Sequence, residues 1–347
     1  MLAALNESAP TATVPAFPGT NRWPSGVGDS APQVNDMSDT LIGVLFATLA
    51  SCCWAIGAVL ARIAMQRIPA GVATLISLSS GFLVVTGVSL FLYGPGLINV
   101  TSTDLLWFVL LALIQFPGGR FLNFNGIRLA GVSTGTAITG SSPLFAALLA
   151  ALFLKEHLTL FVLAGTTAVV YGLSLVMRER GALEPTATPA SALTDAESAA
   201  RRSRRLGILS ALGGAVAYGA AHVLARHIVT TSAPAPVTAC YTLLFGAMAM
   251  LVASSRSVRW DLLKEPRALV KMGVAGVFSS FGPFFMYLSL ARAPVIVVSP
   301  IAAIYPLGAM LLTHLFLKRL ERVTFRMVCG AGLIVFGVAL VIWGNPG

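Results

Sequence analysis

The chain has 347 residues, of which 56% are apolar and 10% are charged, and its formal net charge is +10. Soluble domains carry about 25% charged residues, so this composition excludes a soluble globular protein and indicates an integral membrane protein. The basic residues lie between apolar runs and not along one face or tail, which argues against a nucleic-acid-binding protein.

Residues 1–38 are rich in Pro, Ser, Ala and Gly and contain no apolar run of spanning length. They also lack the basic head and apolar core of a signal peptide, so we expect a disordered tail. Met37 stands directly before the first apolar run and is an alternative start of the chain.

From Leu41 onward the sequence contains ten apolar runs, each long enough to cross about 30 Å of hydrocarbon as a helix. Runs of this length and uniform apolarity predict transmembrane α-helices and not barrel strands, which alternate over about ten residues. The predicted spans are residues 41–61, 72–93, 104–127, 133–154, 159–177, 206–225, 236–254, 271–291, 294–317 and 325–343.

The second half of the sequence repeats the first. Residues 43–62 align without a gap with residues 207–226, so that Trp54 falls opposite Tyr218. Self-similarity at this scale indicates a duplicated unit of about 140 residues, as in transporters built from internal repeats. Five spans per copy is an odd number, so the two copies take opposite orientations in the membrane. Other matched pairs are Pro143 with Pro306, Gly165 with Gly330, and Gly172 with Gly337.

The predicted fold is therefore all-α and integral to the membrane, with ten transmembrane helices arranged as two inverted five-helix repeats. The first repeat covers residues 39–177, a polar linker covers 178–205, and the second repeat covers 206–347. Most of the 23 Lys and Arg residues lie on the linker's side of this topology. The positive-inside rule then places the linker in the cytoplasm and both termini outside.

Three features recur in both halves of the sequence. Each half has five spans, an aromatic residue beside small residues in its first span (Trp54 and Tyr218), and a fourth span that runs from a proline to Glu-x-[Leu/Val]-Thr. In these features the chain resembles the EamA-type transporters of the drug/metabolite transporter superfamily. The resemblance implies a ten-helix carrier that moves a small metabolite by alternating access, with export favoured. The membrane it implies is a cell membrane, namely the bacterial inner membrane. Members of this family usually have cytoplasmic termini and basic loops after spans two and four. Here residues 93–103 contain no Lys or Arg.

The 13 acidic residues lie in the tail, the linker, the loops or the span ends, and none lies in the interior of a run. This argues against a lipophilic-cation exporter and against proton coupling through an intramembrane carboxylate. Glu156 and Glu321 recur at the same place in the two copies beside basic residues. They predict charge pairing at a helix end, with a role in gating as the alternative.

Arg120 lies well inside an apolar run, in a stretch that begins Gln115-Phe-Pro-Gly-Gly. A central arginine costs roughly 2.5–3.5 kcal/mol on insertion scales, so its side chain faces protein or water and not lipid. Its counterpart in the second repeat is Gly282. One interpretation is a clamp for a carboxylate or phosphate, because Pro117 and the two glycines weaken the helix as in discontinuous transporter helices. The other is snorkelling from a span that ends near Phe116.

Seven further residues complete the predicted substrate site because they are polar or aromatic within the spans. Each has a structural alternative: the amides pair helices, the aromatic rings fill the core, and a histidine is a hydrogen-bonded structural residue. Two asparagines lie only two residues apart, so at most one of them faces a given cavity. The seven are Asn123, Asn125, Trp54, Tyr218, Tyr287, His222 and Tyr305.

The sequence also excludes several functions. Its four cysteines lie in apolar runs without CxxC spacing, which predicts neither a disulfide framework nor a metal site. No clustered catalytic groups occur within the spans and no P-loop is present, so we expect no enzyme, no cofactor and no ATP-driven pump.

The leading interpretation is a secondary transporter of a small anionic or zwitterionic metabolite, such as an amino-acid-like compound. The alternative is a flippase or carrier for a lipid-linked group. The expected partners are the metabolite and the lipid bilayer, and the oligomeric state stays open.

Overall fold

The computed structural model describes residues 37–64, 70–94, 97, 100–130, 138–183, 194–254, 266–316 and 325–344. Every regular element in these ranges is a helix, which confirms the all-α class. The expected disordered tail lies outside the described residues except for its last two positions. Both ends of the predicted linker are helical, since they continue the helices on either side of it.

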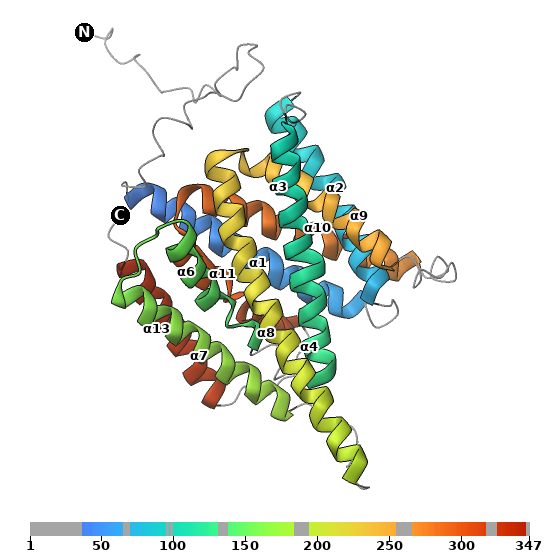
Figure 1. The fold of residues 1–347 in the computed structure, drawn as a ribbon, viewed down its shortest axis with the longest axis vertical. Coiled ribbons are helices and arrows are strands. Elements are labelled where there is room, and N and C mark those ends of the chain that lie inside the picture. The colour runs from blue at the N-terminus through green and yellow to red at the C-terminus, as the bar shows by residue number, and fades with distance from the viewer. Residues whose placement is uncertain are drawn as a thin grey trace, which may run out of the picture.

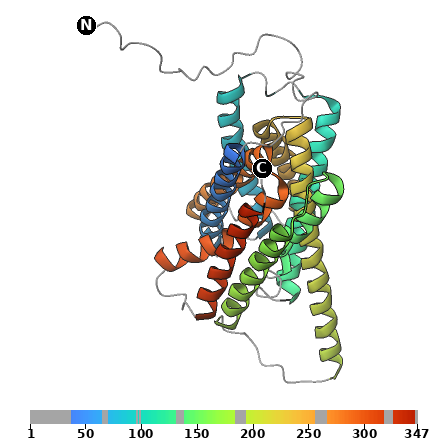
Figure 2. The same cartoon turned by 90° about the vertical axis from the view of Figure 1, so that its left-hand side faces the viewer.

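The helices form one bundle to which both halves of the sequence contribute (Figure 1). The first half supplies α1 (Met37–Ala64), α2 (Ala70–Tyr93), α3 (Ser102–Leu113), the π-helix η3 (Ile114–Phe121), α4 (Leu122–Ala130), α6 (Ser142–Phe153) and α7 (Leu160–Leu183). The second half supplies α8 (Thr194–Thr231), α9 (Ala235–Ser254), α10 (Pro266–Arg292), α11 (Val295–Ala302), α12 (Tyr305–Phe316) and α13 (Phe325–Trp343). The N-terminal end of α8 extends beyond the other described helices in both views (Figures 1 and 2).

Six of the described helices are long and apolar enough to cross a membrane, which makes this a multi-pass membrane protein. They are Ser38–Ala61, Val72–Phe91, Ser102–Phe121, Arg202–Thr231, Ala235–Ala253 and Pro266–Arg292. The other four predicted runs contain shorter apolar helices, at Ser142–Phe153, Leu160–Val176, Val295–Ala309 and Gly332–Trp343.

Glycines bring helices of the two halves into backbone contact. Helices α7 and α13 lie side by side (Figures 1 and 2), and a Cβ built at Gly165 would lie 2.5 Å from the carbonyl oxygen of Gly337. A Cβ at Gly330 would lie 2.8 Å from the carbonyl oxygen of Gly172, so the two helices run antiparallel. Such close approach needs small residues, because lipid supplies little hydrophobic drive for helix association.

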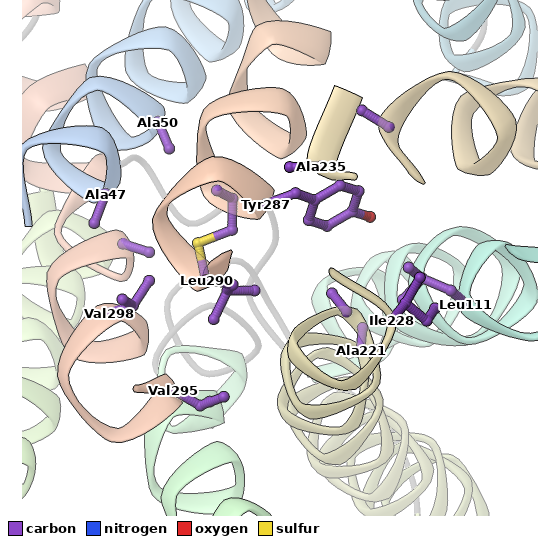
Figure 3. Close-up of a cluster of buried hydrophobic side chains, with 14 of the residues drawn as sticks. Ala47, Ala50, Leu111, Ala221, Ile228, Ala235, Tyr287, Leu290, Val295 and Val298 are labelled. Atoms are coloured by element: carbon purple, nitrogen blue, oxygen red, sulfur yellow. The ribbon is translucent and has the colours of Figure 1, made fainter. Parts of the chain in front are cut away.

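The buried core also joins the halves. Figure 3 shows a part of this core, to which helices of both halves contribute side chains. Most of these side chains are aliphatic, and Tyr287 is the largest fully buried one. The labelled members are Ala47 and Ala50 of α1, Leu111 of α3, Ala221 and Ile228 of α8, Ala235 of α9, Tyr287 and Leu290 of α10, and Val295 and Val298 of α11.

The predicted span 294–317 is not one helix. It divides into α11 and α12 at a turn formed by Ala303 and Ile304. Pro306 has no backbone N–H to bond the carbonyl of Ala302, and the hydroxyl of Ser51 donates to this carbonyl and to that of Ile301, both at 3.0 Å.

The matching proline of the first repeat marks the same kind of helix start. Helix α6 begins at Ser142, one residue before Pro143, just as α12 begins one residue before its proline. Pro143 occupies the first turn of α6, where backbone N–H groups have no intrahelical partner, so its missing N–H costs no hydrogen bond. The repeated proline therefore predicts a helix start in each half.

Candidate functional site

Arg120 lies in a continuous helix with a widened turn. Helix α3 passes into η3 and then into α4 without a break, and Pro117 lies inside η3. Because Pro117 has no N–H, it cannot bond the carbonyl of Leu113, and the backbone widens into a π-helix instead of breaking. The helix is altered at Pro117 but not interrupted, so the alternative in which the span ends near Phe116 is wrong. Wide turns of this kind are frequent at functional sites.

Three polar side chains meet around Arg120. Tyr218 of α8 lies within side-chain hydrogen-bonding reach of Arg120 and of Asn123. The hydroxyl of Thr139 donates to Oδ1 of Asn123 at 2.9 Å, which fixes the orientation of that amide. The guanidinium carbon of Arg120 also lies 5.7 Å from the centroid of the Phe116 ring, within range of a cation–π interaction.

Glycines permit this meeting of η3 and α8. A Cβ built at Gly119 would lie 2.6 Å from Cε1 of Tyr218, and one at Gly214 would lie 3.1 Å from the backbone N of Asn123. Real Cβ atoms do not approach other heavy atoms as closely as the first of these distances. The position next to Arg120 must therefore be glycine for Tyr218 to occupy its place.

Aromatic rings form the other side of the group. Trp54 of α1 and Tyr305 at the start of α12 make an edge-to-face pair with ring centroids 6.1 Å apart. Tyr305 lies within electrostatic range of Tyr218 and Arg120 and remains 39% exposed. Gly282, the repeat counterpart of Arg120, leaves the space that the Trp54 indole fills. We call Arg120, Asn123, Tyr218, Trp54 and Tyr305 the arginine cluster.

The remaining predicted site residues lie outside this cluster. Nδ1 of His222 lies 3.0 Å from the Ser299 hydroxyl of α11, so the histidine links two helices. The hydroxyl of Tyr287 donates to Oε1 of Gln115 at 2.7 Å, within the buried core. Among the described residues, no hydrogen bond joins the partly buried Asn125 to the cluster.

The arginine cluster is suited to bind an anionic group. Across the described ranges, no carboxylate forms an ion pair with Arg120, and the cluster itself contains no acid. A guanidinium donates to carboxylate or phosphate oxygens in a bidentate manner, and a phenol and an amide supply further donors. The cluster draws on both halves, since Arg120, Asn123 and Trp54 belong to the first and Tyr218 and Tyr305 to the second.

Sequence reasoning missed the polar partners of the predicted residues. Gln115, Thr139 and Ser299 each bond a predicted residue, yet none is distinctive as a residue type. Gln115 gave a usable signal, since an amide inside an apolar run needs a partner. Thr139 and Ser299 gave none, because hydroxyl groups in membrane helices often bond their own backbone.

A multi-helix membrane bundle with a cationic and aromatic cluster between its two halves is the arrangement of a membrane carrier. The chain matches the EamA-like transporter family over residues 41–178 and again over residues 205–343, and it belongs to this family. It is accordingly a membrane transporter of the drug/metabolite type.

Comparison with solved structures shows the fold of the whole bundle. A crystal structure of a protein superposes with a TM-score of 0.66 at 20% sequence identity, covering 87% of this chain and 96% of that one. No curated protein matches the chain.

Proposed function

We propose that this protein is a secondary transporter that moves a small anionic or zwitterionic metabolite across the cell membrane by alternating access, with export favoured. In this proposal the chain crosses the membrane ten times as two inverted five-helix repeats, and the linker lies in the cytoplasm. The four shorter apolar helices then serve as the remaining spans, partly within the bundle.

The packing between the halves supports the inverted repeat. Exchanging each glycine for its repeat counterpart turns the contact of Gly165 with Gly337 into that of Gly330 with Gly172, and both contacts exist. A contact that maps onto itself in this way is the signature of a two-fold axis. Inverted repeats are related by such an axis in the membrane plane, and substrates bind near it.

A second pair of contacts follows the same rule. Gly219 of α8 packs on Phe145 and Ala146 of α6, while Gly308 of α12 packs on Ala55 of α1. The first helix of each repeat thus contacts the fourth span of the other. Two rigid halves joined through such smooth surfaces can tilt against each other, as alternating access requires.

The observation that carries the substrate class is the arginine cluster itself. Arg120 has no described acidic partner, although an intramembrane arginine normally finds one. A substrate carboxylate or phosphate supplies the missing charge, and the Trp54 and Tyr305 rings cover its apolar part. A zwitterion such as an amino acid places its cation over these ring faces.

The proposal is tested by metabolite profiling of cells and medium after expression of the wild type, Arg120→Ala, Arg120→Lys or no protein. We expect one anionic or zwitterionic compound to redistribute with the wild type, not to redistribute with Arg120→Ala, and to redistribute weakly with Arg120→Lys, which keeps the charge but loses the bidentate fork. Arg204→Ala, at an exposed position near the start of α8, is the matched control and should behave as the wild type.

Two results would contradict the proposal. Undiminished redistribution by a well-folded Arg120→Ala variant removes the basis for an anionic substrate. Redistribution of a lipid-linked compound between membrane leaflets, with no change in soluble metabolites, favours the flippase alternative.

A further inference from the structure

A second charged site lies in the loop between α6 and α7, at residues 154–159. The carboxylate of Glu156 accepts hydrogen bonds from the backbone N–H groups of Val295 at 3.0 Å and Ile296 at 3.1 Å. These groups begin α11, where no intrahelical partner exists and the N-cap residue Pro294 supplies no side-chain bond. Glu156 of the first half therefore caps a helix of the second half.

Arg226 of α8 holds the helix that precedes α11. Its guanidinium donates to the carbonyl oxygen of Leu290, in the last turn of α10, and its positive charge lies near enough to Glu156 to favour the carboxylate. Negative charge is favourable at a helix N-terminus and positive charge at a C-terminus. Glu156 and Arg226, which we call the hairpin clamp, thus hold both arms of the α10–α11 hairpin. Figure 3 shows Leu290 and Val295 on these two arms.

The loop backbone is shaped to turn Glu156 inward. Lys155 has φ of +56°, the one positive φ of a non-glycine residue among those the structure describes. Its side chain is exposed, while the N–H of Glu156 closes the end of α6 by bonding the carbonyl of Ala150 at 3.4 Å. A lysine in this conformation is strained, so the contacts of Glu156 must hold it there.

Helix α11 connects the hairpin clamp to the arginine cluster. All eight of its residues are buried, and His222 holds it midway through Ser299. At its C-terminal end Ser51 bonds two carbonyls, and the chain then turns into α12, which begins with Tyr305 of the cluster. A short packed helix moves as a unit, so displacement of its N-terminus also displaces Tyr305.

We propose that the hairpin clamp is a gate at this end of the bundle and that Glu156 is its proton-binding group, with the closed gate holding the proton more tightly than the open gate. The proposal rests on the proposed transport function and names the proton as its coupling ion. A state that binds a ligand more tightly is populated by that ligand. Acid therefore closes the gate, and alkaline pH favours its opening.

The surroundings of Glu156 support this direction. Burial raises the pKa of the Glu156 carboxyl, and the N–H donors of α11 together with Arg226 only partly offset the effect. In an open gate the carboxyl faces water, and its pKa returns toward the ordinary range. Closing therefore increases its affinity for a proton.

Other charged groups at this end of the described bundle do not face Glu156. Lys155 and His157 flank it on the loop with exposed side chains. Arg292 of α10 pairs with Asp39 of α1 at 2.6 Å, and both side chains are partly exposed. Helix α11 presents only backbone N–H groups to the carboxylate.

The experiment measures access to a cysteine placed on α11. Val298→Cys, at a position with no exposed surface, is introduced into a full chain without its four native cysteines. The labelling rate with a charged methanethiosulfonate reagent is followed from pH 5 to pH 8 in lipid nanodiscs. Each rate is divided by that of a free cysteine peptide at the same pH, which corrects for the ionisation of an exposed thiol.

We expect the corrected rate to rise several-fold with pH when Glu156 is present and to stay flat and low in Glu156→Gln, which resembles the protonated carboxyl. Arg226→Gln keeps a donor for Leu290 but removes the charge that favours the carboxylate, so its midpoint should move to higher pH. His157→Gln is the control on the same loop and should leave the profile unchanged.

A corrected rate that does not change with pH in the Glu156 background overturns the proposal and leaves Glu156 as a static helix cap. A midpoint that moves to lower pH in Arg226→Gln overturns it as well. Both results can be obtained even if the Glu156→Gln variant does not fold. No substrate enters the assay, so a failure here is distinct from a failure of the metabolite profiling, which tests the transport function through Arg120.

Discussion

Replacing Gly337 by alanine tests the close packing of α7 against α13, on which the two-fold relation of the halves depends. A Cβ at this position would lie 2.6 Å from the carbonyl oxygen of Gly165 and 2.9 Å from both N and Cγ2 of Val169. Ordinary contact begins near 3.4 Å. Two of the three obstructing atoms belong to the α7 backbone and cannot rotate away, so the helices must separate.

The magnitude follows from two opposing effects. Alanine in place of glycine stabilises a helix by up to about 1 kcal/mol. Overpacking costs typically about 1–3 kcal/mol, and the upper part of this range applies because the backbone is obstructed. We therefore expect a net loss of stability of about 1–2 kcal/mol for Gly337→Ala. Gly332 lies on the same helix with no atom near its built Cβ, so Gly332→Ala keeps only the favourable effect.

The measurement is thermal unfolding of the purified variants in one detergent, followed by tryptophan fluorescence. Gly337→Ala should unfold several degrees below the wild type, and Gly332→Ala at or above it. The double variant with Gly165→Ala should lose less than the sum of the single losses, since the first methyl group already separates the helices. A Gly337→Ala protein as stable as Gly332→Ala would refute the packing argument.

Three further predictions concern buried polar contacts, all measurable by the same unfolding assay. Tyr287→Phe leaves Oε1 of Gln115 without its donor and should cost about 1–3 kcal/mol, whereas a loss near zero would mean that water replaces the phenol. Ser51→Ala removes the donor shared by the carbonyls at the end of α11 and should cost a similar amount, with faster amide exchange at Ile301. Protonated Glu156 contributes stability in acid, and this contribution is lost as pH rises through its raised pKa. The Tm of Glu156→Gln should therefore rise relative to that of the wild type between pH 4 and pH 8. A Tm difference between the two proteins that stays constant with pH would contradict this sign.

Much of the fold could be predicted because apolar runs and repeated residues report on the membrane and on duplication. The repeated glycines indicated the duplication, but their contacts between α7 and α13 appear only in the structure. Helix breaks were harder to predict. Pro117 widens a helix and Pro306 follows the break between α11 and α12, where a neighbour, Ser51, satisfies the freed carbonyl of Ala302. Such a neighbour is remote in the sequence.

The site was predicted in part for the same reason. A lone arginine in an apolar run is conspicuous, so Arg120 could be found, and the repeat alignment of Trp54 with Tyr218 gave two of its neighbours. Glu156 was predicted to pair with charges at a helix end, with gating as the alternative, but its actual hydrogen-bond partners could not be predicted. Only the fold shows that this loop turns inward and that the carboxylate meets a helix of the other half.

The energy needed to open the clamped end is small enough for a transporter. The hairpin clamp contains three hydrogen bonds across separate elements, two made by Glu156 and one by Arg226. While Glu156 is ionised, hydrogen bonds to the charged groups contribute roughly 1.5–3 kcal/mol each when the alternative is water, and opening hydrates both charges, which returns part of this energy. The net cost is then a few kcal/mol, at which a minor state is populated to about 0.1–10%. A proton or a substrate that binds one state more tightly by a similar amount is sufficient to switch the gate.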